Sequence, residues 1–310
     1  MLLQLETKMK PNHLDSDANL GRINACLLGI FIREMVQRAM AMTKSGRASY
    51  VASVKGTKDD GSDDIVTDVD TTVQAEIVKM IRENTPGFGL IGEENGVNVP
   101  CTLQGVNAYF TADPIDGTKA FARRQSSGYG PMIALVINER IVAVCIGDSN
   151  TGEMYYHRPN STQVHRMGND HLVTRLSDLD FSASLTTQYA LLRDRPEKYS
   201  PIIQKMIAAN GLFKDLEIGS GGIGLSSARL FKREIGAQIL RPGKQTPWDT
   251  TPVIGLAKML GFVTVEVMPT GNTIVQDIKP QQTTYRTEHE IIMIHGSNLP
   301  ELLTWINANK

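Results

Sequence analysis

The chain has 310 residues, of which 41% are apolar and 21% are charged, the composition of a globular protein with room for about two domains. This composition excludes a disordered chain, a collagen-like chain and a coiled coil. Because 32 basic residues stand against 33 acidic ones, the net charge is −1, and no partnership with nucleic acid is expected.

The first predicted element is a long amphipathic helix over 17–43, where apolar residues recur at helical spacing. The stretch 44–64 is rich in Gly, Ser, Lys and Asp, which predicts a mobile polar loop. Thr67 and Asp70 then have the spacing of an acidic capping box, so a second helix is expected over 68–84.

Short strands are expected next. Two candidates cover 88–91 and 108–112. The segments 132–137, 141–146 and 153–157 are rich in Val, Ile and Tyr and are separated by turn residues, so they predict an antiparallel meander.

The second half has a different character, because strands and helices alternate in it. This change predicts an α+β subdomain over 1–177, followed by an α/β subdomain over 178–310. Its predicted elements are strands at 185–192, 263–267 and 291–295, and helices at 196–209, 222–233, from Trp248 to a C-terminal Gly261, and 299–308.

Neither a membrane span nor a signal peptide is expected. No apolar run approaches about 18 residues, and the N-terminal stretch turns acidic too early for a signal peptide. The cysteines Cys26, Cys101 and Cys145 are widely spaced. We therefore expect a cytoplasmic protein without membrane partners, whose cysteines are reduced and buried.

Carboxylates are concentrated in four short segments where loops and helix starts are expected. Asp113 and Asp116 flank a Pro–Ile turn, so they can point into one small volume, where their repulsion requires a cation. The N–H groups of Gly117 and Thr118, at an expected helix start, suit an anion. Acidic side chains beside such a backbone are what a metal-assisted phosphoryl reaction needs. The four segments are 64–70, 91–94, 113–118 and 248–252.

Each segment by itself also has an ordinary structural interpretation. An Asp–Pro or Asp–Gly turn is most often only a turn. Glu93 and Glu94 could end a strand in solvent, and Asp249 could be a helix N-cap. Spacing alone does not unite the four segments.

Together they resemble a known family. Residues 113–118 read D-P-I-D-G-T and Trp248–Asp249 begin a later helix, with D-x-V-T-x-x-D and G-E-E segments in the expected order. This set is similar to the inositol monophosphatase-like superfamily of magnesium-dependent, lithium-sensitive phosphatases, over about residues 17–305. The resemblance implies a layered αβαβα sandwich with two subdomains and a homodimer.

The resemblance also implies a metal site with two or three Mg²⁺ ions. One ion would be held by Glu93, Asp113 and the backbone carbonyl of Ile115. A second would be held by Asp113, Asp116 and Asp249, and a third, weaker one by Glu93 and water. The expected balance is sound, because four carboxylates carry −4 and two Mg²⁺ ions carry +4.

The catalytic residues implied by the resemblance are Asp70, Thr118 and Glu93. Asp70 and Thr118 would orient and deprotonate a metal-activated water, and Glu93 would act through its ion. The N–H groups of Gly117 and Thr118 would bind the phosphate. The implied reaction is hydrolysis of a small phosphorylated metabolite, similar to an inositol monophosphate.

The substrate-binding candidates are less specific. Relatives that act on inositol phosphate usually have a glutamate seven residues before the aspartate of the Trp–Asp pair, which is Asp249 here. This chain has Pro242 at that position, flanked by Arg241 and Lys244. Lys119 directly follows Thr118, which resembles the D-G-T-K sequence of those branches of the family that act on nucleotide bisphosphates. These three cations are either substrate contacts or solvated charges, and a 3′(2′),5′-bisphosphate nucleotidase or a histidinol-phosphate phosphatase remains an alternative.

Two interpretations from other classes remain. Residues 219–224 fit the dinucleotide pattern G-x-G-x-x-G, but no acidic residue follows about 20 positions later. In the resembled family a Gly–Ser pair here lines the substrate pocket, which makes Ser220 a candidate contact. A non-catalytic regulatory protein with the same fold is the other alternative, against which the four intact carboxylates argue.

Overall fold

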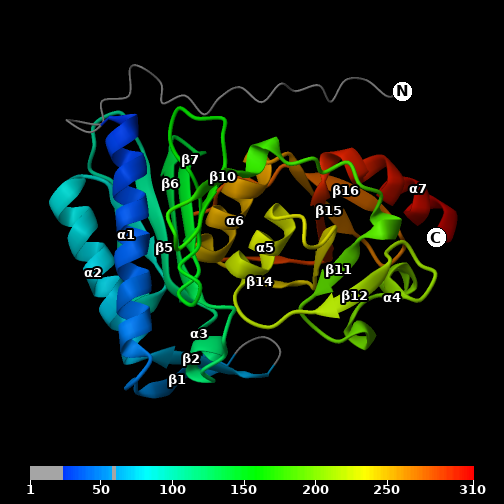
Figure 1. Cartoon of the computed structure of the whole chain (residues 1–310), viewed down its shortest axis with the longest axis horizontal. Helices are drawn as coiled ribbons and strands as arrows, with labels where there is room; N and C mark the ends of the chain where they lie inside the picture. The colour runs from blue at the N-terminus through cyan, green and yellow to red at the C-terminus, as the bar shows by residue number, and fades with distance from the viewer. Residues whose placement is uncertain (1–23, 58–60) are drawn as a thin grey trace.

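The computed structural model describes residues 24–57 and 61–310, and these residues form five layers. Helices α1 (Ala25–Gly46) and α2 (Asp68–Asn84) cover the outer face of one large sheet. Helices α5 (Ile223–Phe231) and α6 (Pro247–Met259) lie between this sheet and a second one (Figure 1). Helices α4 (Pro201–Ile207) and α7 (Leu299–Asn309) lie beyond the second sheet. The predicted αβαβα sandwich is confirmed.

The two outer helices of the first sheet begin at side-chain caps. The Asn24 side chain accepts a hydrogen bond from the N–H of Leu27 at 3.0 Å, and α1 continues to Gly46; residues 17–23 of the predicted helix lie outside the described residues. At α2 the predicted capping box of Thr67 and Asp70 is present in both directions. The local pattern was sufficient here because a capping box involves residues only three positions apart.

The mobile loop predicted for 44–64 is wrong. This stretch contains the end of α1 and an antiparallel hairpin of β1 (Ala52–Thr57) and β2 (Asp63–Thr67), in which Val54 pairs with Ile65. Every residue of β1 is exposed, so this strand has no buried face and therefore no alternation of apolar and polar residues to predict it. Residues 58–60 lie outside the described residues.

The larger sheet contains the predicted antiparallel meander. Within the described chain its strand order is β10-β9-β8-β7-β6-β5-β3-β4. Strand β5 continues past the predicted 108–112 to Asp116, because a bulge lets Asp116 pair with Gly130 of β6. The bounds are β3 (Gly89–Gly92), β4 (Asn98–Val99), β5 (Ala108–Asp116), β6 (Gly130–Ile137), β7 (Arg140–Gly147), β8 (Met154–His157), β9 (His165–Met167) and β10 (Val173–Arg175).

The second sheet has the order β12-β11-β13-β18-β15-β16 in the part of the chain that the structure describes. Strands β12, β11 and β13 are parallel to one another, and the pairs β13–β18, β15–β18 and β15–β16 are antiparallel. The bounds are β11 (Tyr189–Leu192), β12 (Asp215–Ile218), β13 (Ala237–Leu240), β15 (Phe262–Val267), β16 (Thr273–Gln276) and β18 (Glu290–His295).

Two predicted elements of the second half are shorter than expected. The strand predicted over 185–192 begins with a 3₁₀ turn, η3 (Leu185–Thr187), and only β11 is extended. The helix predicted over 196–209 is divided into η4 (Pro196–Lys198) and α4, because Pro201 has no N–H for a continuous helix and instead starts a new one. Strands β12, β13 and β16 were not predicted, since their apolar runs are very short.

The remaining elements frame the middle of the molecule. Helix α6 contacts strands of both sheets and is buried around most of its surface; it ends at Met259, just before the predicted Gly261. None of the described helices is long and apolar enough to cross a membrane. The small elements are α3 (Thr118–Ala122), η1 (Glu94–Gly96), η2 (Leu176–Asp178), η5 (Gly296–Asn298) and a ribbon of β14 (Gly243–Gln245) with β17 (Tyr285–Thr287).

The three cysteines are free thiols, but they are not all buried. Cys145 is buried in the larger sheet and Cys101 is half-buried, whereas Cys26 is exposed. The prediction that all three are buried is therefore wrong for Cys26, which lies on the first turn of α1, where only one face of the helix meets the sheet.

Candidate active site

Three aspartates from distant parts of the chain come together where the two sheets and the middle helices meet. Each of Asp113, Asp116 and Asp249 offers a carboxylate oxygen, and these oxygens lie within 4.8 Å of one another. Asp113 and Asp116 are buried, with 2% and 8% exposure, and Asp249 is half-buried. Such a cluster is tolerable only when protons or cations neutralise it.

The bulge at the end of β5 positions the first two carboxylates. The N–H of Ile115 donates to Oδ1 of Asp113 at 2.9 Å. The next residue after the bulge, Gly117, has a φ of +89°, and a Cβ there would lie 2.2 Å from the carbonyl oxygen of Gly128. Only glycine fits this position, so the chain can turn from β5 into α3.

Asp116 is held by the start of α5. The N–H groups of Ile223 and Gly224 donate to its two carboxylate oxygens at 3.0 and 2.7 Å. The preceding Gly222 donates its N–H to the carbonyl of Gly128 at 2.8 Å. A Cβ on Gly222 would lie 2.1 Å from Oδ2 of Asp116. The glycines of the G-x-G-x-x-G pattern thus let the second half approach Asp116, which is a packing reason for the pattern.

Replacing Gly222 by alanine is expected to destabilise the protein by about 1–3 kcal/mol and to weaken Mg²⁺ binding, because the new methyl group must push Asp116 or α5 aside. Thermal unfolding and calorimetric titration with Mg²⁺ measure the two effects. Gly56→Ala is the matched control, because a Cβ on Gly56 meets nothing within 4 Å. Equal effects of the two substitutions would contradict the steric argument.

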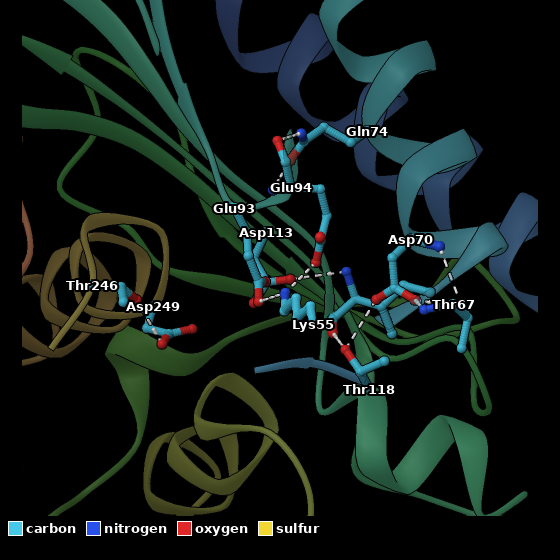
Figure 2. A network of polar contacts seen from close by, with 11 residues as sticks. Lys55, Thr67, Asp70, Gln74, Glu93, Glu94, Asp113, Thr118, Thr246 and Asp249 are labelled. Carbon is cyan, nitrogen blue, oxygen red and sulfur yellow. Dashed lines mark hydrogen bonds and ion pairs between the residues drawn. The ribbon is translucent and has the colours of Figure 1, made fainter. Parts of the chain in front are cut away.

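Asp249 lies in the first turn of α6, close to the positive end of the helix dipole. The hydroxyl of Thr246, the N-cap residue, donates to Oδ2 of Asp249 at 2.7 Å. Pro247 at the first helical position fixes where α6 begins. The helix start therefore places Asp249 beside the aspartates of β5, and Figure 2 shows it on the side of Asp113.

Asp70 and Thr118 form a second polar unit beside the aspartates (Figure 2). The hydroxyl of Thr118 lies 2.9 Å from Oδ1 of Asp70 and 3.1 Å from the carbonyl oxygen of Ile115. The N–H of Thr67 donates to Oδ2 of Asp70 at 2.8 Å, and the Thr67 hydroxyl donates to the same oxygen. Burial raises the pKa of Asp70, and the hydrogen bonds from Thr67 and Thr118 partly offset this.

Lys55 contacts the predicted ligand Glu93 and was missed by the sequence analysis. Its Nζ lies 2.8 Å from Oε1 of Glu93 and 2.5 Å from Oε1 of Glu94. Burial alone would lower the pKa of Lys55, but the two carboxylates raise it overall. A lysine in a polar stretch that predicts a loop carries no signal of such a contact.

Glu93 lies near the three aspartates, but its ion pair is with Lys55. Its charge raises the pKa of Asp113, although burial is the larger cause. The neighbouring Glu94 has a pKa raised to about 7, mainly by burial, with Lys55 acting in the opposite direction.

A buried glutamine supports the backbone of this segment. The N–H of Glu94 donates to Oε1 of Gln74 at 2.8 Å, and the amide nitrogen of Gln74 donates to the carbonyl of Glu94. Gln74 comes from α2 and is 2% exposed. It is a positioning residue that the sequence did not reveal, because its partner lies 20 positions away.

The electrostatics of the cluster suit a hard divalent cation. Burial raises the pKa of Asp113 well above its ordinary value, and repulsion from Glu93, Asp116 and Asp249 adds to this. Burial and then Asp249 raise the pKa of Asp116 to about 7, against the charge of Arg193. The donor set consists of carboxylate oxygens, which Mg²⁺ prefers, so the residues present fit this ion.

Mg²⁺ is expected to stabilise the protein more at about pH 8 than at about pH 5.5. Folding without metal raises the pKa of Asp116 from 3.8 to about 7. Between these two pH values the metal-free folded state therefore binds more protons than the unfolded chain. The group's contribution to stability is full below the unfolded pKa and is lost as the pH rises through the folded pKa. Mg²⁺ replaces these protons. Thermal unfolding with Mg²⁺ or EDTA measures the difference, and a shift independent of pH would contradict it.

The predicted substrate-binding cations lie at different places around the site. Lys119 donates to the hydroxyl of Ser62 on the β1–β2 hairpin at 2.6 Å. Arg241 forms an ion pair with Asp194 at 3.3 Å. Lys244 lies on β14 and is exposed. Ser220 is exposed on the glycine loop before α5. Their roles toward a substrate stay predictions.

Comparison with known proteins gives a family match across most of the chain. The model of the inositol monophosphatase family matches residues 29–303. The protein named Nus factor SuhB from Salmonella typhimurium LT2 is 35% identical over 95 residues, which cover 31% of this chain and 34% of that protein. Inositol monophosphatase from Dictyostelium discoideum is 34% identical over 91 residues, covering 28% and 31%. The chain thus spans about a third of the length of these curated relatives.

Solved structures match over nearly the whole chain. The extragenic suppressor protein SuhB from Bartonella henselae has a TM-score of 0.67 at 17% identity, covering 91% of this chain and 98% of its own. An IMPase/NADP phosphatase has a TM-score of 0.68 at 16% identity, covering 93% and 98%. At these identities the matches bear on the fold, which they share with this chain.

Proposed function

Because the chain belongs to the inositol monophosphatase family, we propose that it is a Mg²⁺-dependent phosphomonoesterase acting on a small phosphorylated metabolite. Family membership supports phosphatase activity. The observation that carries the proposal is the convergence of Asp113, Asp116 and Asp249 within 4.8 Å, beside the hydrogen-bonded pair of Thr118 and Asp70.

The proposed metal ligands are the residues that the family resemblance implies. Asp113, Asp116 and Asp249 would hold one ion, and Glu93, Asp113 and the carbonyl of Ile115 another, with a third near Glu93. Bound Mg²⁺ supplies Lewis-acid polarisation of the phosphoryl group and lowers the pKa of water. Lys55 forms an ion pair with Glu93 near these aspartates, and a ligand that holds an ion together with Asp113 has to lie there.

Thr118 and Asp70 supply the route for the proton. The Thr118 hydroxyl can take a proton from the attacking water while it passes its own to Oδ1 of Asp70, 2.9 Å away. Burial raises the pKa of Asp70, which makes it a better proton acceptor near neutral pH. The N–H groups of Gly117 and Thr118 are proposed to bind the phosphate. The water oxygen bonds to phosphorus and the ester P–O bond breaks. The leaving oxygen takes up a proton from solvent, and Asp70 releases the proton that it received to solvent.

The names of the solved relatives support a small phosphorylated metabolite as the substrate. Their structures include SaIMPase-II with inositol monophosphate, an IMPase/NADP phosphatase with NADP and Ca²⁺, and a lithium-soaked inhibitory complex of staphylococcal inositol monophosphatase-1. We extend lithium sensitivity and divalent-metal dependence to this chain as proposals, together with a homodimer and a cytoplasmic location. Light scattering of the purified protein tests the dimer.

A regulatory role is the second candidate function, and the similarity to proteins named Nus factor SuhB favours it. The two candidates differ in phosphate release. We expect Mg²⁺-dependent, lithium-inhibited release from at least one of inositol 1-phosphate, adenosine 3′,5′-bisphosphate, histidinol phosphate and fructose 1,6-bisphosphate. No release from any of them with Mg²⁺ present would contradict the enzyme and leave the regulatory role.

A further inference from the structure

An arginine absent from the motifs lies at the edge of the second sheet nearest the proposed site. Strands β12, β11 and β13 are parallel, with Leu192 of β11 aligned to Ile218 and Ile239. Their carboxyl ends therefore meet at one edge, the usual place for ligand binding beside parallel strands. Arg193 follows β11 there, next to the glycine loop that follows β12.

The structure holds Arg193 in place through its backbone and its side chain. Its N–H donates to the hydroxyl of Tyr199 at 3.3 Å, and that hydroxyl donates to the carbonyl of Ile239 at 3.2 Å. Tyr199 is 4% exposed. The guanidinium of Arg193 donates to the carbonyl of Gly221 at 2.7 Å.

This contact brings the guanidinium next to the metal-binding aspartates. Gly221 precedes Gly222, and the two residues after that hold Asp116 through their N–H groups. A Cβ on Gly222 would lie 2.1 Å from Oδ2 of Asp116, so the residue next to the one that Arg193 contacts lies directly against that carboxylate. The side chain of Arg193 itself is exposed to solvent.

Arg193 also differs from the neighbouring cations in its partners. Arg241 pairs with Asp194 at 3.3 Å, and Lys198 pairs with the same carboxylate at 3.0 Å. Within residues 24–57 and 61–310, no carboxylate lies within ion-pair distance of Arg193. A guanidinium has five N–H donors, and the contact with Gly221 leaves others for an anion.

We propose that Arg193 binds a second anionic group, a phosphate or a carboxylate, on the substrate whose phosphate ester lies at Asp113, Asp116 and Asp249. This inference rests on the proposed phosphatase function and narrows its substrate class to doubly anionic metabolites. Arg193 is a specificity-determining residue in this arrangement. The carboxylate directly after Arg193, that of Asp194, is paired with Arg241 and Lys198.

The test compares substrates that differ only in the second anion. Adenosine 3′,5′-bisphosphate is compared with adenosine 3′-phosphate for a second phosphate, and 3-phosphoglycerate with glycerol 3-phosphate for a carboxylate. In at least one pair we expect the doubly anionic member to have the lower KM. Arg193→Gln should raise that KM by about 10- to 100-fold, with kcat changed less than about threefold, because a charge-assisted hydrogen bond is lost.

The variants separate specificity from support of the loop. Arg193→Lys keeps the charge and should restore part of the lost affinity, which covers the case in which Arg193→Gln does not fold. Arg195→Gln is the matched control, because Arg195 is exposed two positions away on the same segment and should leave both KM values unchanged.

Two results would overturn the inference. One is an equal loss of kcat/KM on both members of each pair in Arg193→Gln, which would assign the residue to supporting Gly221 and Asp116. The other is wild-type hydrolysis of singly anionic substrates with KM values as low as those of their doubly anionic partners. Both differ from failure of the proposed function, in which the wild-type protein releases phosphate from nothing.

Discussion

Asp249→Asn is expected to lower Mg²⁺-dependent phosphate release by about 10³-fold or more while the protein still folds. Phosphate monoesters hydrolyse very slowly in water, so most of the rate enhancement depends on a complete metal site. The substitution keeps the size of the side chain and an oxygen for the hydroxyl of Thr246, now 2.7 Å from Oδ2 of Asp249. It removes a charge that repels Asp116. The metal-free variant should therefore unfold at the same or a higher temperature than the wild type.

Two measurements check this prediction together. Phosphate release gives the loss of activity, and thermal unfolding with and without Mg²⁺ gives the loss of metal binding as a smaller Mg²⁺-induced shift. Asp116→Asn should show the same loss of activity but is less stable, because its oxygen can accept from only one of the N–H groups of Ile223 and Gly224 and its amide nitrogen cannot accept from the other.

The matched control for both substitutions is an aspartate outside the site. Asp277 is exposed and pairs with Lys258, so Asp277→Asn should change neither activity nor the Mg²⁺-induced shift. Wild-type turnover in Asp249→Asn on every accepted substrate would show that Asp249 is not a ligand.

Thr118→Val is expected to lower kcat by about 10²- to 10⁴-fold, because the attacking water loses its proton acceptor. Valine has nearly the shape of threonine, so α3 should keep its position. The buried carboxyl of Asp70 loses the hydrogen bond from Thr118, which raises its pKa further. The Mg²⁺-induced shift in unfolding temperature should persist, because Thr118 offers no carboxylate to the ion.

Steady-state kinetics separate this loss from a loss of binding. Thr118→Ser restores the hydroxyl and should recover most of kcat, which a purely structural role of the methyl group would not allow. Asp70→Asn should lose activity to a similar degree, but it also weakens the capping box with Thr67. A Thr118→Val enzyme with wild-type kcat would rule out the proton route through this pair.

The parts of the fold that were predictable are those that short stretches of chain specify. The capping box of Thr67 and Asp70 involves residues three positions apart, and the meander of β6, β7 and β8 has strong apolar runs separated by turn residues. The same reasoning failed for the β1–β2 hairpin, which is exposed on its first strand. It also joined η4 and α4 into one helix, since apolar periodicity continues across Pro201.

The candidate site was predictable to the extent that motifs name residue types. The sequence named Asp113, Asp116 and Asp249 through a family resemblance, and the structure has their carboxylates within 4.8 Å. It could not reveal Lys55 or Gln74, whose contacts with Glu94 join residues 39 and 20 positions apart. Such pairs leave no periodic pattern.

The amino-acid sequence by itself indicated individual helices, strands and caps, because these patterns act over a few residues. The family, the layered architecture and the acidic residues available to a metal ion followed from the resemblance of its motifs to a known family. Only the tertiary structure decided which charges meet. Arg193 contacts Gly221, in the loop whose following residues hold Asp116, because parallel strands end at a common edge. Lys55 contacts Glu93 from the β1–β2 hairpin. These contacts depend on the path of the whole chain, and burial then gives them their electrostatic weight.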